Sequence, residues 1–308
     1  KKGNVAYGTL TSISESPFRF GLIYVGSDDG YINVTKNGGG TWKRISNDLP
    51  KNLWVSRVIA SKFKKERVYV TLSGYRFDDF TSYIYLSDDY GLTWKSISNN
   101  IPTAPVNVIK EDSTNEKILY VGTDNGLYIS FNQGDSWEVF SKNLPNVAVH
   151  DLVIQPIAKD LIIGTHGRSL YKAKVASLQK MTPSVLAKPI HVFEIKNIRK
   201  NDSWGRSRNQ WRAPYTPELK IPFYSSSTKT ITICIFKNDI KVNTLSLDAD
   251  SGYNEAVFDL SFSEKGKRAY EKLNKGVKLI ESKNGVYYLK KGEYIVKIND
   301  INTGFKIK

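Results

Sequence analysis

Short runs of β-branched and aromatic residues, separated by glycine, proline, asparagine and aspartate, follow one another through the first 175 residues of the chain. Runs of about four to eight such residues, bounded by turn-forming residues, predict β-strands. They form four groups of similar order, at 9–14, 22–26 and 31–34; at 54–60, 67–72 and 83–86; at 106–110, 118–121 and 126–129; and at 148–154, 161–164 and 169–173. No helical period interrupts them, so the pattern predicts consecutive all-β units.

The pattern changes after residue 175. Residues 176–192 predict a linker with one short helical turn near 177–180, and further strand runs follow at 230–236, 240–247, 255–260, 285–289 and 294–298. Their spacing, with turns at 237–239 and 250–252, predicts a small β-sandwich over 193–308. A short amphipathic helix is predicted as an insertion at 264–273.

An eight-residue motif recurs in the first three units, best preserved at 87–94 (Ser-Asp-Asp-Tyr-Gly-Leu-Thr-Trp). Looser copies lie at 35–42 and 130–137, and the final tryptophans are 94 − 42 = 52 and 137 − 94 = 43 residues apart. A repeat of about 40–45 residues is typical of propeller blades. The sequence therefore predicts a β-propeller of about four blades in residues 1–175, belonging to a larger propeller.

Each copy of the motif has a structural logic. A short polar side chain at the third position accepts hydrogen bonds from the loop backbone, the glycine adopts a conformation that other residues resist, and the tryptophan is an apolar anchor. The positions that carry this logic are Thr35, Asn37, Gly39 and Trp42; Ser87, Asp89, Gly91 and Trp94; and Ser130, Asn132, Gly134 and Trp137.

This motif resembles the Asp-box (BNR) repeat of sialidase-like, sortilin-like and xyloglucanase-like β-propellers. The resemblance implies a hairpin turn on the outer rim of a blade, with a structural and not a catalytic role. Asn37 and Asn132 stand where the repeat prefers aspartate. Asparagine keeps the acceptor oxygen but weakens a metal-binding interpretation of these loops.

A second resemblance covers most of residues 5–175 and continues beyond them. The stretches 51–58, 106–112, 148–154 and 164–168 look like the last blades of large secreted bacterial proteins with a sortilin-type propeller, labelled glycosyl hydrolases by analogy. In that family a C-terminal immunoglobulin-like sandwich follows, and 211–214 and 252–260 resemble its hallmarks. The resemblance implies a larger parent protein that is exported to the periplasm, the cell surface or the medium.

Composition adds a strongly basic charge, +15 at pH 7 with a pI near 9.5. This charge suits an anionic surface, but no nucleic-acid motif is present, and the interleaved lysines and glutamates at 265–291 favour a solvated face. An acidic partner protein and anionic outer-membrane lipid stay open as binding partners.

Cys234, the single cysteine, is expected to be a small buried hydrophobe. No apolar run is long enough to span a membrane. No signal peptide is visible and the sequence begins at Lys1 and not at Met, so we expect a processed or truncated product.

Several polar residues are candidates for a binding site at the centre of the propeller: Trp54, Arg57, Arg76, Asp78, Asp79, His150, His166 and Arg168. A glycosidase needs two carboxyl groups about 5–5.5 Å or 6.5–9.5 Å apart, and adjacent strand residues such as Asp78 and Asp79 point to opposite faces. His150 and His166 lack a third metal ligand in sequence reach. We therefore expect no metal and no cofactor, and the catalytic residues, if any, are unassigned.

Three functions follow from these features. The first is a non-catalytic module of an exported or cell-envelope protein that binds a partner protein, a glycan or the remaining blades of its own parent. The second is a glycoside hydrolase that acts on a polysaccharide in the propeller funnel. The third is a basic adhesin for anionic polymers, whose binding would weaken as salt screens its charge.

Overall fold

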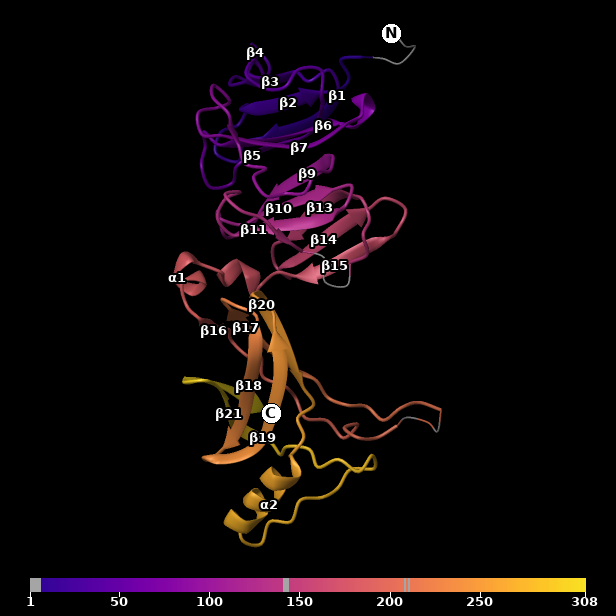
Figure 1. Cartoon of the computed structure of the whole chain (residues 1–308), viewed down its shortest axis with the longest axis vertical. Coiled ribbons are helices and arrows are strands. Elements are labelled where there is room, and N and C mark those ends of the chain that lie inside the picture. The colour runs from indigo at the N-terminus through magenta and orange to yellow at the C-terminus, as the bar shows by residue number, and fades with distance from the viewer. Residues whose placement is uncertain (1–6, 141–143, 208, 210) are drawn as a thin grey trace. The chain divides into compact units, whose positions relative to one another are not determined.

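The structure, a computed structural model, describes residues 7–140, 144–207, 209 and 211–308 (Figure 1). It divides into two compact units, with the boundary in the sequence between Lys180 and Met181. This boundary falls within the predicted linker. The described strands of the first unit are β1 (Leu10–Glu15), β2 (Ile23–Ser27), β3 (Ile32–Thr35), β4 (Lys43–Arg44), β5 (Trp54–Ala60), β6 (Val68–Gly74), β7 (Asp79–Ser87), β8 (Lys95–Ser96), β9 (Val106–Glu111), β10 (Leu119–Thr123), β11 (Gly126–Ser130), β12 (Glu138–Val139), β13 (Val149–Gln155), β14 (Asp160–Thr165) and β15 (Leu170–Lys174).

Consecutive strands pair antiparallel in four sheets of the described first unit: β1–β4, β5–β8, β9–β12 and β13–β15. We call these sheets blades 1 to 4. An up-and-down sheet of about four strands, repeated along the chain, is the architecture of a propeller blade. The structure therefore confirms the predicted all-β fold of propeller blades, and blade 4 has three strands within the described residues.

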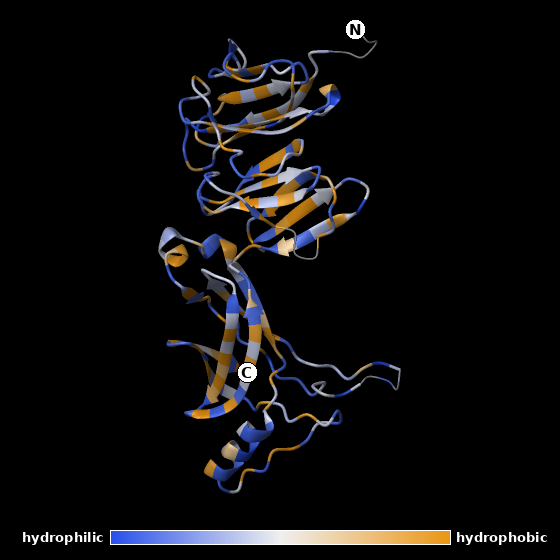
Figure 2. Ribbon diagram, in the orientation of Figure 1, coloured by the Kyte–Doolittle hydropathy of each residue, from blue (hydrophilic) through white to orange (hydrophobic). Residues whose placement is uncertain are grey.

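Successive blades pack face to face through apolar side chains. One hydrophobic core joins blades 1 and 2, and a second joins blades 2 and 3. Figure 2 shows hydrophobic residues concentrated in the strands and hydrophilic residues in many of the loops. The inner strands approach so closely that a Cβ built on Gly26 would lie 2.3 Å from Cγ1 of Val55, and one on Gly122 would lie 2.6 Å from Cγ1 of Val149. These two positions therefore need glycine.

The three copies of the eight-residue motif, at 35–42, 87–94 and 130–137, form the same turn, and we call them boxes 1 to 3. In the second box, Ser87 Oγ accepts from Gly91 N at 2.8 Å, and Asp89 Oδ1 accepts from Thr93 N at 2.9 Å. Asn37 Oδ1 and Asn132 Oδ1 accept the equivalent bonds at 2.9 Å from Thr41 N and Ser136 N. Asparagine thus replaces aspartate here because only the acceptor oxygen is needed.

Two of the box tryptophans form a hydrogen bond between their own blade and the preceding blade. Trp94 Nε1 donates to the carbonyl of Ile45 in blade 1, and Trp137 Nε1 donates to the carbonyl of Ile97 in blade 2, both at 2.7 Å. Trp137 is buried at this interface. The box is therefore an inter-blade contact as well as a turn.

The stability of the second box depends on pH through the carboxyl group of Asp89. Burial raises the pKa of this carboxyl, but hydrogen bonds from Thr93, Ser87 and the loop backbone outweigh it and lower the pKa to about 2. Because the folded-state pKa is depressed, the carboxylate stabilises the fold above about pH 4 and this contribution is lost as the pH falls through about 2. The contribution is about 1 kcal/mol after discounting for solvent screening.

We expect Asp89→Asn to fold and to lose this part of the acid dependence, since Asn37 and Asn132 form the same turn. The measurement is the thermal unfolding midpoint of both proteins between pH 2 and pH 5. The original chain should lose more stability over this range than the variant. An equal loss in both would contradict the role given to Asp89.

The second unit is a sandwich of two antiparallel sheets within its described residues. One sheet has the order β16 (Ile190–Val192), β17 (Leu219–Ser225), β20 (Gly252–Phe258), and the other has the order β19 (Ile240–Ala249), β18 (Lys229–Lys237), β21 (Gly292–Ile298), β22 (Ile301–Ile307). Buried side chains of both sheets, such as Phe223 and Phe258 from one and Ile233 and Val296 from the other, form one core. The predicted β-sandwich is therefore confirmed.

A helix, α2 (Glu264–Leu273), lies between β20 and β21, where the sequence predicts one. Ser263 caps it by accepting from Gly266 N at 3.0 Å. Gly266 lies against β19, because a Cβ built there would be 2.0 Å from the carbonyl oxygen of Val242. Shorter helices are the 3₁₀ turns Tyr75–Phe77 and Leu178–Lys180 and the single turn α1 (Pro183–Leu186).

The strand predicted at 285–289 is wrong. These residues form only an isolated bridge between Tyr288 and Ser261, and Leu289 N donates to Leu260 O from a loop. Strands β16, β17 and β22 are missing from the prediction. Pro222 obscures the strand pattern of β17. Its carbonyl accepts from Phe193 N, directly after β16, and its lack of an N–H ends the pairing between β16 and β17.

No helix in the described part of the chain is long and apolar enough to cross a membrane.

Candidate functional site

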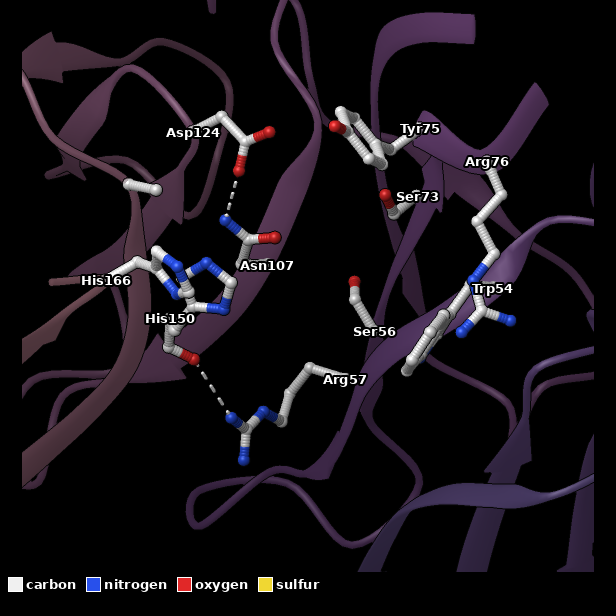
Figure 3. Close-up of a pocket in the computed structure, with 11 residues that line it drawn as sticks. Trp54, Ser56, Arg57, Ser73, Tyr75, Arg76, Asn107, Asp124, His150 and His166 are labelled. Atoms are coloured by element: carbon white, nitrogen blue, oxygen red, sulfur yellow. Dashed lines mark hydrogen bonds between the residues drawn. The ribbon is translucent and has the colours of Figure 1, made fainter. Parts of the chain in front are cut away.

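A pocket of about 650 Å³ lies in the first unit, at the first strands of blades 2, 3 and 4 (Figure 3). Trp54, Ser56 and Arg57 belong to β5, Asn107 to β9 and His150 to β13. Because successive blades place their first strands side by side, residues nearly 100 positions apart meet here. The lining residues are Trp54, Ser56, Arg57, Ser73, Tyr75, Arg76, Asn107, Asp124, Ala148, His150 and His166.

Five of the eight predicted binding residues line this pocket. They are Trp54, Arg57, Arg76, His150 and His166. The structure thus brings together residues that the sequence could connect only through the expected propeller.

Trp54 and Arg76 form the side of the pocket that belongs to blade 2. The guanidinium carbon of Arg76 lies 4.0 Å from the centroid of the Trp54 ring, a cation–π arrangement. Arg76 Nη1 is 3.8 Å from Asp28 Oδ2, and the Arg76 side chain is exposed. The stacking orients the guanidinium while leaving donors free for a ligand.

Arg57 crosses from blade 2 towards blade 4. Its Nη2 donates to Asp151 Oδ1 at 2.9 Å and to the carbonyl of His150 at 3.4 Å. Its Nε is buried and has no hydrogen-bond partner among the described residues. The Nη2 end of the Arg57 guanidinium is therefore held by blade 4, while its Nε–H has no partner among the described residues.

Polar residues of blades 2 and 3 complete the lining, and the sequence analysis did not select them. Asn107 Nδ2 donates to Asp124 Oδ1 at 2.8 Å, and Ser56 Oγ donates to the carbonyl of Val106 at 2.6 Å. Asn107 stands in β9 one residue after its start, close to the level of Ser56 and Arg57 in β5, a register that only the structure shows. Ser73 stands in β6 one residue before its end, and Tyr75 follows directly after β6.

His150 and His166 lie close together on blade 4, as Figure 3 shows. Their ring centroids are 5.3 Å apart with an angle of 39° between the planes. His166 N donates to the carbonyl of Ala148 at 2.9 Å, which fixes the loop after β14. Across the described residues there is no group of three histidine, cysteine or acidic side chains that could hold a metal ion.

Three predicted residues lie outside the pocket lining. Asp78 follows the 3₁₀ turn in a left-handed conformation and is exposed, and Arg168 is exposed after β14. Asp79 accepts from Thr81 N at 3.0 Å and from Tyr83 OH at 2.8 Å, and these bonds lower its pKa. Asp78 therefore belongs to the loop between β6 and β7, and Asp79 is the first residue of β7 and pairs with Gly74 at the end of β6.

The chemistry available in the pocket is recognition through stacking and hydrogen bonding. Asp124 is the one carboxylate among its described lining residues, and Asn107 occupies one of its oxygens. Glycoside hydrolysis requires a pair of carboxyl groups. The described lining does not provide such a pair.

Comparisons with known proteins give distant structural likenesses. No protein-family model matches the chain, and no curated protein matches its sequence. It is similar to a GH74 enzyme of Niastella koreensis, with 11% identity, a TM-score of 0.45, 82% of this chain and 38% of that one covered. It is also similar to a GH74 xyloglucanase of Xanthomonas campestris, with 11% identity, a TM-score of 0.45 and coverages of 96% and 47%.

A third similar structure is YCF48 of Cyanidioschyzon merolae, with 14% identity, a TM-score of 0.38 and coverages of 72% and 69%. The chain spans less than half the length of the two GH74 proteins.

Proposed function

We propose that this chain is a non-catalytic propeller-and-sandwich module of an exported or cell-envelope protein, and that its pocket binds a segment of a partner protein. The assignment to the Asp-box, sortilin-like proteins with an immunoglobulin-like C-terminal domain, and with it the exported location, is part of this proposal. It is supported by the resemblance of the boxes and by the shared turn geometry of the three copies.

The observation that carries the binding function is the composition of the pocket. Trp54, Tyr75, Arg57 and Arg76 line one open cavity, with a second set of polar groups at Asn107 and Asp124. Tryptophan, tyrosine and arginine are the residue types that dominate the energetics of protein interfaces. The two guanidinium groups favour a partner segment that carries a carboxylate.

A random peptide library displayed on phage and selected on the 308-residue chain tests the proposal. We expect enrichment of peptides that contain aspartate or glutamate together with an apolar residue. Trp54→Ala should weaken binding of a selected peptide by about 2 kcal/mol, roughly 30-fold, because the stacking surface is lost. Arg76→Ala, at an exposed side chain, should weaken it without affecting folding.

Arg168→Ala is the matched control, because Arg168 is exposed and does not line the pocket. Its affinity should equal that of the original chain. Peptide binding that survives both Trp54→Ala and Arg76→Ala would place the site elsewhere. Release of reducing sugar from xyloglucan, or binding of that polysaccharide in place of peptides, would contradict the proposal of a protein partner.

A further inference from the structure

In the second unit, a hairpin of residues 204–215 extends away from the two sheets (Figure 1). At its base, Gly205 N donates to the carbonyl of Tyr215 at 2.8 Å. Trp204 is buried there and packs edge-on against the ring of Tyr288, with the ring centroids 5.8 Å apart. Because both rings belong to the core of the sandwich, the base of the hairpin is fixed to that core.

The segment 271–285, which runs from the end of α2 into the following loop, lies against this hairpin. A Cβ built on Gly205 would be 2.5 Å from Asn284 Oδ1 and 2.6 Å from Cβ of Ser282. Figure 1 shows the loop after α2 projecting from the same side of the sandwich as the hairpin. We call the exposed described residues of 204–215 and 271–285 the hairpin face.

The hairpin face carries large apolar side chains that no described residue covers. Trp211 is 86% exposed and Ile280 is 87% exposed. Tyr215 in the hairpin and Leu273 at the end of α2 are exposed as well. A single exposed apolar residue is ordinary, but several on adjoining segments mark an interaction site.

The same face is strongly basic. Glu271 accepts from Leu279 N at 2.8 Å, and Glu281 accepts from Tyr287 OH at 2.7 Å, so both carboxylates already have a partner within the second unit. Six basic side chains of the face are exposed: Arg206, Arg212, Lys272, Lys275, Lys278 and Lys283. An excess of six cations over two engaged carboxylates favours an anionic partner.

We propose that the hairpin face binds the surface of an anionic lipid bilayer. Trp211 and Tyr215 lie among the lipid headgroups, where amphipathic aromatic rings are favoured. The aliphatic side chain of Ile280 enters the boundary between headgroups and acyl chains. The basic side chains contact lipid phosphates, and each of them strengthens binding to an anionic membrane surface.

The aliphatic side chains of the face distinguish a bilayer from a soluble polyanion. A nucleic acid or an acidic polysaccharide satisfies guanidinium and ammonium groups and offers a surface for stacking on Trp211. Neither supplies the hydrocarbon that removes Ile280 and Leu273 from water. The inference goes beyond the proposed function, because none of these residues lines the pocket of the first unit.

Flotation with lipid vesicles tests the inference. The 308-residue chain is mixed with vesicles of phosphatidylcholine containing roughly one-third phosphatidylglycerol, or with vesicles of phosphatidylcholine alone. We expect the chain to float with the anionic vesicles and to stay in solution with the neutral ones. The double variant Trp211→Ser, Ile280→Ser should bind the anionic vesicles roughly ten-fold more weakly. The double variant Lys275→Gln, Lys278→Gln should bind them roughly 30-fold more weakly at low salt.

Matched controls come from exposed residues of the first unit. Ile157 is 89% exposed, and Lys43 and Lys51 are exposed lysines. The variant Ile157→Ser and the double variant Lys43→Gln, Lys51→Gln alter the same kinds of side chain, yet their vesicle affinity should stay within about two-fold of that of the original chain. All the substituted side chains are exposed, so every variant should keep the unfolding midpoint of the original chain.

Tryptophan fluorescence shows whether the face reaches the acyl chains. Phospholipid brominated on its acyl chains should quench part of the fluorescence of the original chain, and Trp211→Tyr should remove this quenching. Undiminished vesicle binding by the Trp211→Ser, Ile280→Ser variant, or equal losses in the control variants, overturns the inference. Binding to dextran sulfate but to neither kind of vesicle overturns it as well.

Discussion

Replacing Trp137 with alanine is expected to lower the free energy of unfolding of the first unit by about 3–5 kcal/mol. The indole is buried between blades 2 and 3, and its Nε1 bonds to the carbonyl of Ile97 at 2.7 Å. Truncation leaves a cavity at the interface and a carbonyl without its donor, and the two losses add. Calorimetry of the full chain should show the transition of the first unit at a much lower temperature.

Trp42→Ala is the matched control for this prediction. The two tryptophans end equivalent boxes, but Trp42 is half exposed and has no preceding blade in the described structure. Its removal from the 308-residue chain should change the free energy of unfolding by less than about 1 kcal/mol. Similar losses for both variants would show that the box tryptophan acts within its own turn and not between blades.

Glu111→Ala is the second substitution with a large expected effect, a loss of about 3 kcal/mol. Glu111 lies at the end of β9 and is almost fully buried. Its carboxylate accepts from Lys62 N at 2.6 Å, from Ser61 Oγ at 2.7 Å and from Tyr69 OH at 3.2 Å, all in blade 2. Alanine leaves the three donors, two of them on buried Ser61 and Tyr69, without their acceptor and removes this contact between the two blades.

The measurement is chemical denaturation of the full chain at pH 7, with Glu116→Ala as the control. Glu116 is a half-exposed carboxylate 3.6 Å from Nη1 of buried Arg67, which keeps Asp88 as a closer ion-pair partner at 2.6 Å, so the loss of Glu116 should cost little. We expect less than about 1 kcal/mol from this control. A Glu111→Ala protein as stable as the control would mean that water replaces the carboxylate among the three donors.

The blades were predictable because their determinants are local. A hairpin needs only alternating residues and a turn, and each box forms hydrogen bonds within eight residues, from Thr35 to Trp42, Ser87 to Trp94 and Ser130 to Trp137. Such contacts leave a repeated pattern in the sequence. The sandwich was less clear, since Pro222 hides β17, and the buried loop residues Tyr288 and Leu289 resemble a strand.

The pocket could be predicted only in part. Trp54, Arg57 and Arg76 stood out by residue type, and all three line it. Asn107 and Asp124 did not, because an ordinary polar residue near a strand end gives no sign of what faces it. Their role depends on which blades meet, and that requires contacts between distant segments.

The sequence alone determined the element type, the repeat and the turn chemistry of this protein, because backbone preference and side-chain spacing act over a few residues. Only the tertiary structure decided which side chains share the pocket and which apolar residues stay uncovered. Ile13 and Val58 show the reason: both are apolar residues at the same strand position, yet one is exposed and the other buried. Burial depends on the presence of a neighbouring blade, which the residue itself cannot encode.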